Sequence, residues 1–183
     1  NRLIKTQNFK NPKYVGDPLN AVKIFNEKSV DEIMVVDISC SRDGKEPNFE
    51  LIRKLAVECR MPLSYGGGIK NIKQAKHILS LGVEKVSLSS VLFENPGIIQ
   101  QLSSEIGAQS VVATLDVKKK RFGSSYDIYT LNAKKKQSKS LNEMLDYCLM
   151  SGAGEVVINS IDQDGLMKGY DNSLIKQVKN KLN

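Results

Sequence analysis

The sequence predicts an α/β fold in which repeated βα units build a parallel sheet. Short apolar segments alternate with longer segments whose apolar residues recur at helical spacing. Successive short segments lie roughly thirty residues apart, which suffices for a strand, a crossover helix and the return to a parallel neighbour. The short segments are almost continuously apolar, as expected for strands that are covered on both faces.

The first third of the chain is expected to hold one strand-like segment, two helices and the first parallel strand. Residues 2–9 (RLIKTQNF) alternate polar and apolar side chains, as a strand does. Residues 18–28 and 48–58 carry apolar residues on one side of a helix. Between these helices, residues 32–38 (EIMVVDI) form the first expected parallel strand.

Four further strands and four further helices follow. The expected parallel strands cover residues 62–65, 85–88, 110–115 and 155–160, and the expected helices cover residues 71–81, 96–106, 141–151 and 172–182. One insertion interrupts this order after Asp116. There, polar and aromatic residues alternate around Gly123–Ser125, which indicates a β-hairpin.

Composition indicates a globular protein of one domain, residues 1–183. The chain has 183 residues, of which 40% are hydrophobic and 26% charged. A complete (βα)₈ barrel typically needs roughly 250 residues, so the chain is short for that fold. The net charge of +7 favours an anionic partner. Because the basic runs 118–121 and 134–136 lack interleaved aromatic residues, we expect solvated loops there and no nucleic-acid partner.

The cysteines and the hydropathy pattern predict a cytoplasmic protein. Cys40, Cys59 and Cys148 are far apart and lack CxxC spacing, so neither a disulfide framework nor a zinc site is expected. No apolar run approaches the length that spans a bilayer, so no membrane partner is expected.

Three glycines after an expected strand form a candidate phosphate site. Gly66–Gly68 lead from a strand into a helix, where a turn without Cβ atoms can bring backbone N–H groups close to an oxyanion. A tight turn can also need glycine for steric reasons alone. Ser89 and Ser90, at the end of the next strand, would add hydroxyl groups beside this turn.

Asp116 is the candidate acid/base group, because it ends a buried strand where ligands of parallel α/β proteins bind. The alternative is a structural carboxylate that pairs with Lys118. Asp162 and Asp164 flank a flexible turn but lack the further ligands of a calcium loop, so no metal is expected. His77 lies within an expected helix, which argues against nucleophilic hydrolysis.

Six motifs, taken together, resemble the cyclase subunit of imidazole glycerol phosphate synthase, HisF. They occur in the same order and at similar spacing over essentially the whole chain. The motifs are GDP (16–18), DE followed by an apolar strand that ends in Asp37-Ile38 (31–38), YGGGIK (65–70), GVEKVSLSS (82–90), GAQSVVATLD (107–116) and GAGEVVINSIDQDGLMKGYD (152–171). The resemblance implies a (βα)₈ TIM barrel of the histidine-biosynthesis type, here incomplete, with the first strand and the last two strands missing.

The resemblance also implies a lyase reaction and a set of site residues, with no cofactor. Ammonia from a glutaminase subunit, bound as a heterodimer, would convert a bisphosphorylated formimino substrate into imidazole glycerol phosphate and aminoimidazole carboxamide ribotide. Asp116 and Lys5 match catalytic residues. The matched phosphate-binding residues are Gly67, Gly68, Ser89, Ser90, Asp164 and Gly165, and the matched ammonia-gate residues are Glu32, Lys85 and Glu155.

Two departures leave alternatives open. The family usually has Asn-Thr where this chain has Ser89-Ser90, and its second catalytic aspartate lies on the first strand, which is absent here. Residues 8–32 resemble more closely a paralogous branch found with surface-polysaccharide genes, in which the barrel passes ammonia to a sugar amidotransferase without cyclising a substrate. A generic phosphate-binding barrel would explain the glycines but neither SIDQDG nor the gate residues.

Overall fold

The computed structural model describes residues 2–182 and begins with a two-stranded antiparallel hairpin. This hairpin consists of β1 (Leu3–Gln7) and β2 (Lys10–Gly16). Helix α1 (Pro18–Glu27) follows directly, because the Asp17 side chain caps its first turn and proline occupies its first position. The tip of the hairpin reaches the loop after the last strand, where the Asn8 N–H donates to the Asp164 carbonyl at 3.0 Å.

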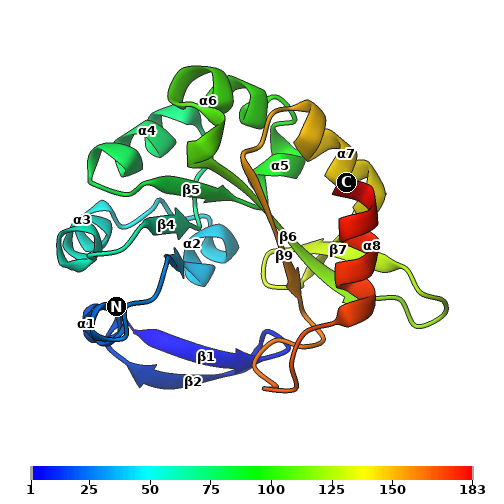
Figure 1. Ribbon diagram of the computed structural model, residues 1–183, viewed down its shortest axis with the longest axis horizontal. Coiled ribbons are helices and arrows are strands. Elements are labelled where there is room, and N and C mark those ends of the chain that lie inside the picture. Colours follow the sequence, from blue (N-terminus) through cyan, green and yellow to red (C-terminus); the bar gives the residue numbers. More distant parts are fainter. Residues whose placement is uncertain (1, 183) are drawn as a thin grey trace.

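Five parallel strands form the centre of the protein, and all five were predicted. They are β3 (Ile33–Val36), β4 (Leu63–Gly66), β5 (Lys85–Leu88), β6 (Val111–Lys119) and β9 (Glu155–Ser160). Each pairs in parallel with the next in the order β3-β4-β5-β6-β9. In Figure 1 they follow an arc, with helices on its outer side. The prediction of an incomplete (βα)₈ barrel is confirmed.

The predicted helices cover the outer face of this arc. They are α3 (Phe49–Glu58), α4 (Ile72–Ser80), α6 (Ile98–Ile106), α7 (Leu141–Met150) and α8 (Asn172–Leu182). Apolar side chains from helices and strands, such as Ile52, Ile78, Leu102 and Leu88, are fully buried in one core cluster. None of the helices in residues 2–182 is both long and apolar enough to cross a membrane.

Short helices follow two of the strands, and the sequence patterns did not reveal them. These are α2 (Ile38–Asp43) after β3 and α5 (Val91–Glu94) after β5; a 3₁₀ turn (Ala108–Ser110) precedes β6. Helices of one or two turns are too short to show a helical period. The sequence feature that marks the start of α2 is its N-cap residue, Asp37. Its carboxylate accepts hydrogen bonds from the Ser39 N–H at 2.9 Å and the Cys40 N–H at 3.1 Å.

The expected hairpin after Asp116 is confirmed, and it is longer than predicted. Strand β6 continues past the parallel sheet and pairs antiparallel with β7 (Tyr126–Thr130), so the turn lies around Gly123. A further strand, β8 (Lys135–Ser140), pairs antiparallel with β7 through a second turn at residues 131–134. This second turn lies back at the carboxyl end of the parallel strands, next to Asp116.

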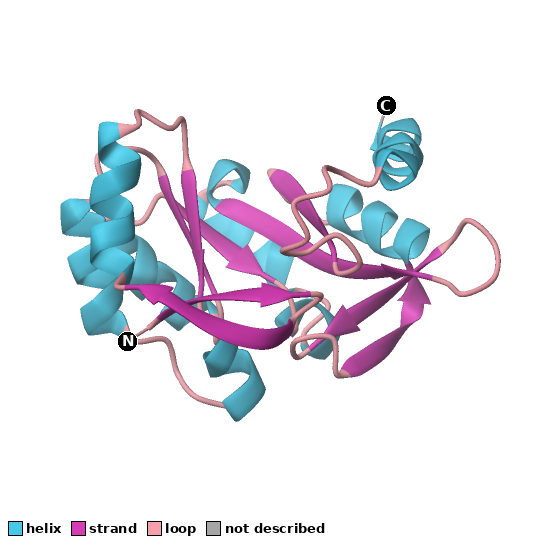
Figure 2. Cartoon of the chain, turned by 90° about the horizontal axis from the view of Figure 1, so that it is seen from below, coloured by secondary structure: helices cyan, strands magenta, loops and turns pink. Residues whose placement is uncertain are grey.

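Both ends of the parallel arc have free edges within the described part of the chain. Strand β3 pairs only with β4 on one side, and β9 pairs only with β6. Apolar side chains near these ends are exposed, among them Val36 (51%) and Ile24 (55%). Figure 2, viewed from below, shows the β1–β2 hairpin in front of the strands. The hairpin therefore lies across the open side of the arc, and its tip contacts the loop after β9.

Candidate functional site

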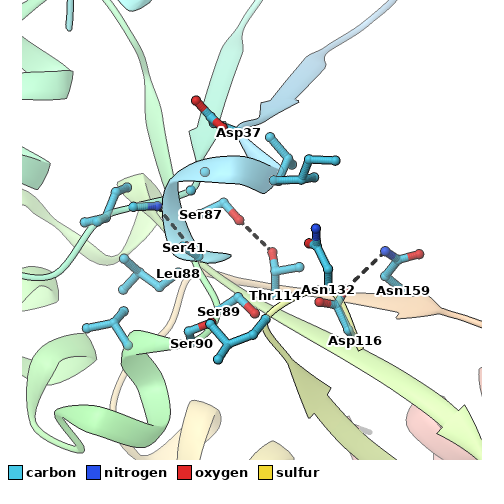
Figure 3. A pocket seen from close by; sticks show the side chains of 18 of the residues that line it. Asp37, Ser41, Ser87, Leu88, Ser89, Ser90, Thr114, Asp116, Asn132 and Asn159 are labelled. Atoms are coloured by element: carbon cyan, nitrogen blue, oxygen red, sulfur yellow. Dashed lines mark hydrogen bonds between the residues drawn. The ribbon is translucent and has the colours of Figure 1, made fainter. Parts of the chain in front are cut away.

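A cavity of about 270 Å³ lies at the carboxyl ends of the parallel strands. Each of these strands, or the segment directly after it, contributes to its wall, and two hairpin tips complete it. The lining residues discussed below include polar side chains and two glycines, and several of them are drawn in Figure 3. They are Thr6, Ser41, Gly67, Gly68, Ser89, Ser90, Thr114, Asp116, Asn132, Asn159 and Asp164. The structure thus brings together most of the residues that were predicted to form the site.

The triple-glycine turn forms one wall of the cavity, and steric need accounts for two of its glycines. Gly67 (φ +111°) lies so close to Asp37 that a Cβ atom would overlap the Asp37 carbonyl oxygen. A Cβ atom on Gly68 (φ +72°) would lie 2.7 Å from Cβ of Cys40. The Gly68 N–H already donates to Ser41 Oγ at 3.1 Å. An oxyanion at this turn would therefore compete with Ser41 for that donor.

Ser89 and Ser90 face the same cavity from the end of β5. Both side chains are partly buried and line the cavity beside the glycine turn. Among the described residues, neither hydroxyl has a hydrogen-bond partner, and Ser90 does not cap α5 with its side chain. Two unengaged hydroxyl groups beside glycine N–H groups form an arrangement suited to an oxyanion such as phosphate.

Asp116 lies at the centre of the site, on β6. Its Oδ1 accepts a hydrogen bond from Nδ2 of Asn159 on the neighbouring strand β9, at 3.1 Å. Burial raises the pKa of the Asp116 carboxyl to about 6, the hydrogen bond from Asn159 opposes this increase, and the negative charge of Asp164 adds to it. The alternative ion pair with Lys118 does not form. Asp116 is therefore a carboxyl group that faces the cavity and has a pKa raised towards neutrality.

Asp164 ties the β1–β2 hairpin to the loop after β9. Its Oδ2 accepts from Thr6 Oγ1 at 2.8 Å and from the Phe9 N–H at 3.1 Å. A Cβ atom on Gly165 would overlap the Thr6 carbonyl, so glycine permits this close approach. Asp162 instead accepts from the Lys119 N–H at 2.8 Å. No group of three or more potential metal ligands occurs within residues 2–182.

Two of the residues predicted for this site, Lys5 and Gly165, do not line the cavity. Lys5 lies exposed on β1, where its Nζ is 3.6 Å from Sδ of Met167. Its neighbour Thr6 lines the cavity instead. Because adjacent residues of a strand point to opposite sides, a contact between Lys5 and a ligand would require the hairpin to move.

A charged cluster lies at the opposite ends of the same strands. Nζ of Lys85 lies 2.8 Å from Oε2 of Glu32 and 2.5 Å from Oε1 of Glu155. Glu32 also accepts from Ser64 Oγ at 2.7 Å. The hydrogen bond from Lys85 lowers the pKa of Glu32, while the bonds to Glu155 and Glu32 raise the pKa of Lys85. The three residues predicted to act together are thus joined in one ion-pair cluster.

The model of the family described as "Histidine biosynthesis protein" matches residues 1–183, the full length of the chain. The chain is a HisF-like member of this family. A Lactococcus lactis protein (strain SK11) named imidazole glycerol phosphate synthase subunit HisF is 37% identical over 182 residues, which cover 100% of this chain and 70% of that protein.

HisF relatives with provisional names are more similar in sequence. A Vibrio vulnificus protein, provisionally named imidazole glycerol phosphate synthase subunit hisF3, is 58% identical over 97% of this chain and 68% of that protein. A Pseudomonas aeruginosa protein, provisionally named subunit hisF2, is 45% identical over 96% of this chain and 70% of that protein. The HisF-like chain thus spans about 70% of the length of these relatives.

The structure adds residues to this HisF-like site that the sequence did not single out. Ser41 comes from the unpredicted helix α2, and Asn132 comes from the unpredicted turn between β7 and β8. Thr114 lies two residues before Asp116 and shares a 2.7 Å hydrogen bond with Ser87. Strand alternation could have identified Thr114, because residues 114 and 116 point to the same side. No comparable sequence signal identifies Ser41 or Asn132.

Proposed function

We propose that the intact protein is the cyclase subunit of imidazole glycerol phosphate synthase, a lyase of histidine biosynthesis. It would use ammonia to convert the phosphoribulosyl-formimino intermediate into imidazole glycerol phosphate and aminoimidazole carboxamide ribotide. The observation that carries this proposal is Asp116, a carboxyl group with a pKa of about 6 that faces the cavity at the strand ends. Such a group can give or take a proton near neutral pH, as ring closure requires.

The glycine turn and the two serines support a phosphate anchor for this substrate. We assign one phosphate to Gly67, Gly68, Ser89 and Ser90, whose serine hydroxyls are unengaged among the described residues. We assign the second phosphate to the region of Asp164 and Gly165. The carboxylate of Asp164 would repel a phosphate, and the N–H groups of Gln163, Asp164 and Leu166 already donate to carbonyls of the loop. The Gly165 N–H is therefore the donor that we expect to bind this phosphate.

The charged cluster supports an ammonia route from a glutaminase partner in a cytoplasmic heterodimer. Glu32, Lys85 and Glu155 lie at the ends of the strands that are remote from the cavity. Polar side chains lie at both ends of this route, because Ser64 donates to Glu32 and the Ser87–Thr114 pair lines the cavity. Ammonia entering at the cluster would pass these hydroxyl groups on its way to Asp116.

The test supplies the intact protein with the formimino substrate and free ammonium, with no glutaminase present. Wild-type protein should form the imidazole product, and Asp116→Asn should form it at least about a hundredfold more slowly. Asp162→Asn is the matched control, because Asp162 lies outside the cavity lining and, among the described residues, accepts from the Lys119 N–H alone. Absence of product with wild-type protein would reject the cyclase assignment.

A second candidate function follows from the relatives. The chain is 58% and 45% identical to proteins provisionally numbered hisF3 and hisF2, and 37% identical to the Lactococcus HisF. This difference favours a paralogue of HisF. The resemblance of residues 8–32 to the surface-polysaccharide branch then makes ammonia transfer from a glutaminase to a sugar amidotransferase the second candidate. Such a protein would bind the glutaminase and release ammonia but would not cyclise the formimino substrate. The free-ammonium assay separates the two functions.

A further inference from the structure

The turn between β7 and β8 has an unusual backbone. Leu131, Asn132 and Ala133 have φ values of 54°, 56° and 61°, so three consecutive residues other than glycine adopt the left-handed conformation. Each such residue costs roughly 1 kcal/mol, and asparagine tolerates the conformation best. The buried Thr130, which accepts from Gln137 Nε2 at 2.7 Å, fixes the end of β7 beside this turn. The surrounding structure therefore maintains a strained turn.

The strained turn forms part of the cavity wall. Leu131 and Asn132 line the cavity together with Asp116 and Asn159. The turn therefore presents Leu131 and Asn132 to the cavity beside Asp116.

The Asn132 carboxamide faces the cavity without a partner. Figure 3 shows its side chain in the same part of the cavity as Asp116 and Asn159. The Asn159 amide is engaged with Asp116, whereas no hydrogen bond involves the Asn132 side chain within residues 2–182. Asn132 is partly buried. A partly buried amide, held in place by a strained turn, offers two donors and one acceptor to a ligand in the cavity.

We propose that Asn132 is a specificity-determining residue, whose carboxamide hydrogen-bonds an uncharged polar group of the substrate beside Asp116. This inference rests on the proposed cyclase function. A neutral amide suits a hydroxyl or amide group, whereas the serines and the glycine turn suit a phosphate. Asn132 would therefore select the part of the substrate that lies between the phosphate anchors.

Calorimetric titration of the intact protein with the bisphosphorylated formimino substrate, in the absence of ammonia, tests this role. The variant Asn132→Gly removes the amide but keeps a residue that adopts the left-handed conformation without strain. Its Kd should be about three- to tenfold higher than that of wild type, as for the loss of one hydrogen bond. The matched control Ala133→Gly changes the strain of the same turn without removing an amide, and its Kd should stay within about twofold of wild type.

Three outcomes separate this inference from the function on which it rests. An unchanged Kd for Asn132→Gly would overturn the role of Asn132 alone. An equal increase in Kd for both glycine variants would also overturn it, because the rigidity of the turn and not the amide would then control binding. Failure of the wild-type protein to bind the formimino substrate would overturn the cyclase assignment and this inference together.

Discussion

Asn159 donates a hydrogen bond of 3.1 Å to the Asp116 carboxylate, and this bond joins two neighbouring parallel strands inside the cavity. The two residues are also direct register partners, because Asp116 of β6 pairs with Asn159 of β9. The bond fixes the orientation of the carboxylate and favours its ionised form, whereas burial favours the protonated form. The balance of these two effects leaves Asp116 able to exchange protons near pH 6.

The pH dependence of turnover should report this balance. If ionised Asp116 acts as the base, kcat/KM with free ammonium should rise with pH with a midpoint near pH 6 and level off roughly one pH unit above it. The variant Asn159→Leu removes the bond that favours the ionised form, so the midpoint of this rise should move to higher pH. Gln177→Leu, which removes an amide that donates to Asn142 outside the cavity, is the control and should not move it. An unmoved midpoint in Asn159→Leu would contradict the role given to this bond.

Asp116 should reduce the stability of the fold at neutral pH. Its pKa is raised in the folded state from 3.8 to about 6, so the unfolded state ionises more easily. The cost is absent below about pH 4 and is fully present above about pH 6, where it reaches about 3 kcal/mol. Asp116→Asn should therefore increase the free energy of unfolding at pH 7 but not at pH 4, as measured by denaturant titration. A stabilisation of equal size at both pH values would disprove the elevated pKa.

Gly67 should be far more sensitive to substitution than a glycine in open space. Gly67→Ala places a Cβ atom against the Asp37 carbonyl in addition to straining the backbone, so it should lower the free energy of unfolding by about 3 kcal/mol or more. Gly169 (φ +83°) is the matched control, because no atom lies within 4 Å of a Cβ atom built there. Gly169→Ala should cost about 1 kcal/mol. Equal losses would show that contact with Asp37 contributes nothing.

Substitution of Lys85 should lower turnover when the glutaminase supplies the ammonia, and should have little effect on turnover when free ammonium is supplied. Lys85→Met leaves Glu32 and Glu155 without their shared cation, so glutamine-dependent turnover should fall by about tenfold, the equivalent of about 1.4 kcal/mol. Turnover with saturating free ammonium should stay within about twofold of wild type. Lys54→Met, which breaks an exposed ion pair with Glu50, is the control. Equal losses with both ammonia sources would contradict a gating role.

The parallel strands and their order could be predicted because their signals are local. Buried strands such as residues 111–115 are continuously apolar, and the crossover helices between them carry a clear period. Strand ends also place Asp116 and Ser89 at one edge of the sheet. These features depend on short stretches of sequence and on the general rule that ligands bind at carboxyl ends.

The remaining parts of the site depend on contacts between distant segments. The tip of the β1–β2 hairpin is fixed by Asp164, roughly 155 residues away. The turn that presents Asn132 contains three left-handed residues, none of which is glycine, so the usual sequence signal for such a turn is missing. The orientation of Lys5 also depends on the distant contact that positions the hairpin, so the sequence alone did not reveal that Lys5 points away from the cavity.

The most direct test of the account is single-turnover conversion of the formimino substrate by the intact protein with saturating ammonium, comparing wild type with Asp116→Asn. We predict that both proteins bind the substrate with Kd values within about threefold of each other. We also predict that the variant forms the imidazole product at least about a hundredfold more slowly. Equal rates in the two proteins, or no product from either, would contradict a cavity in which Asp116 acts on a bound phosphate ester.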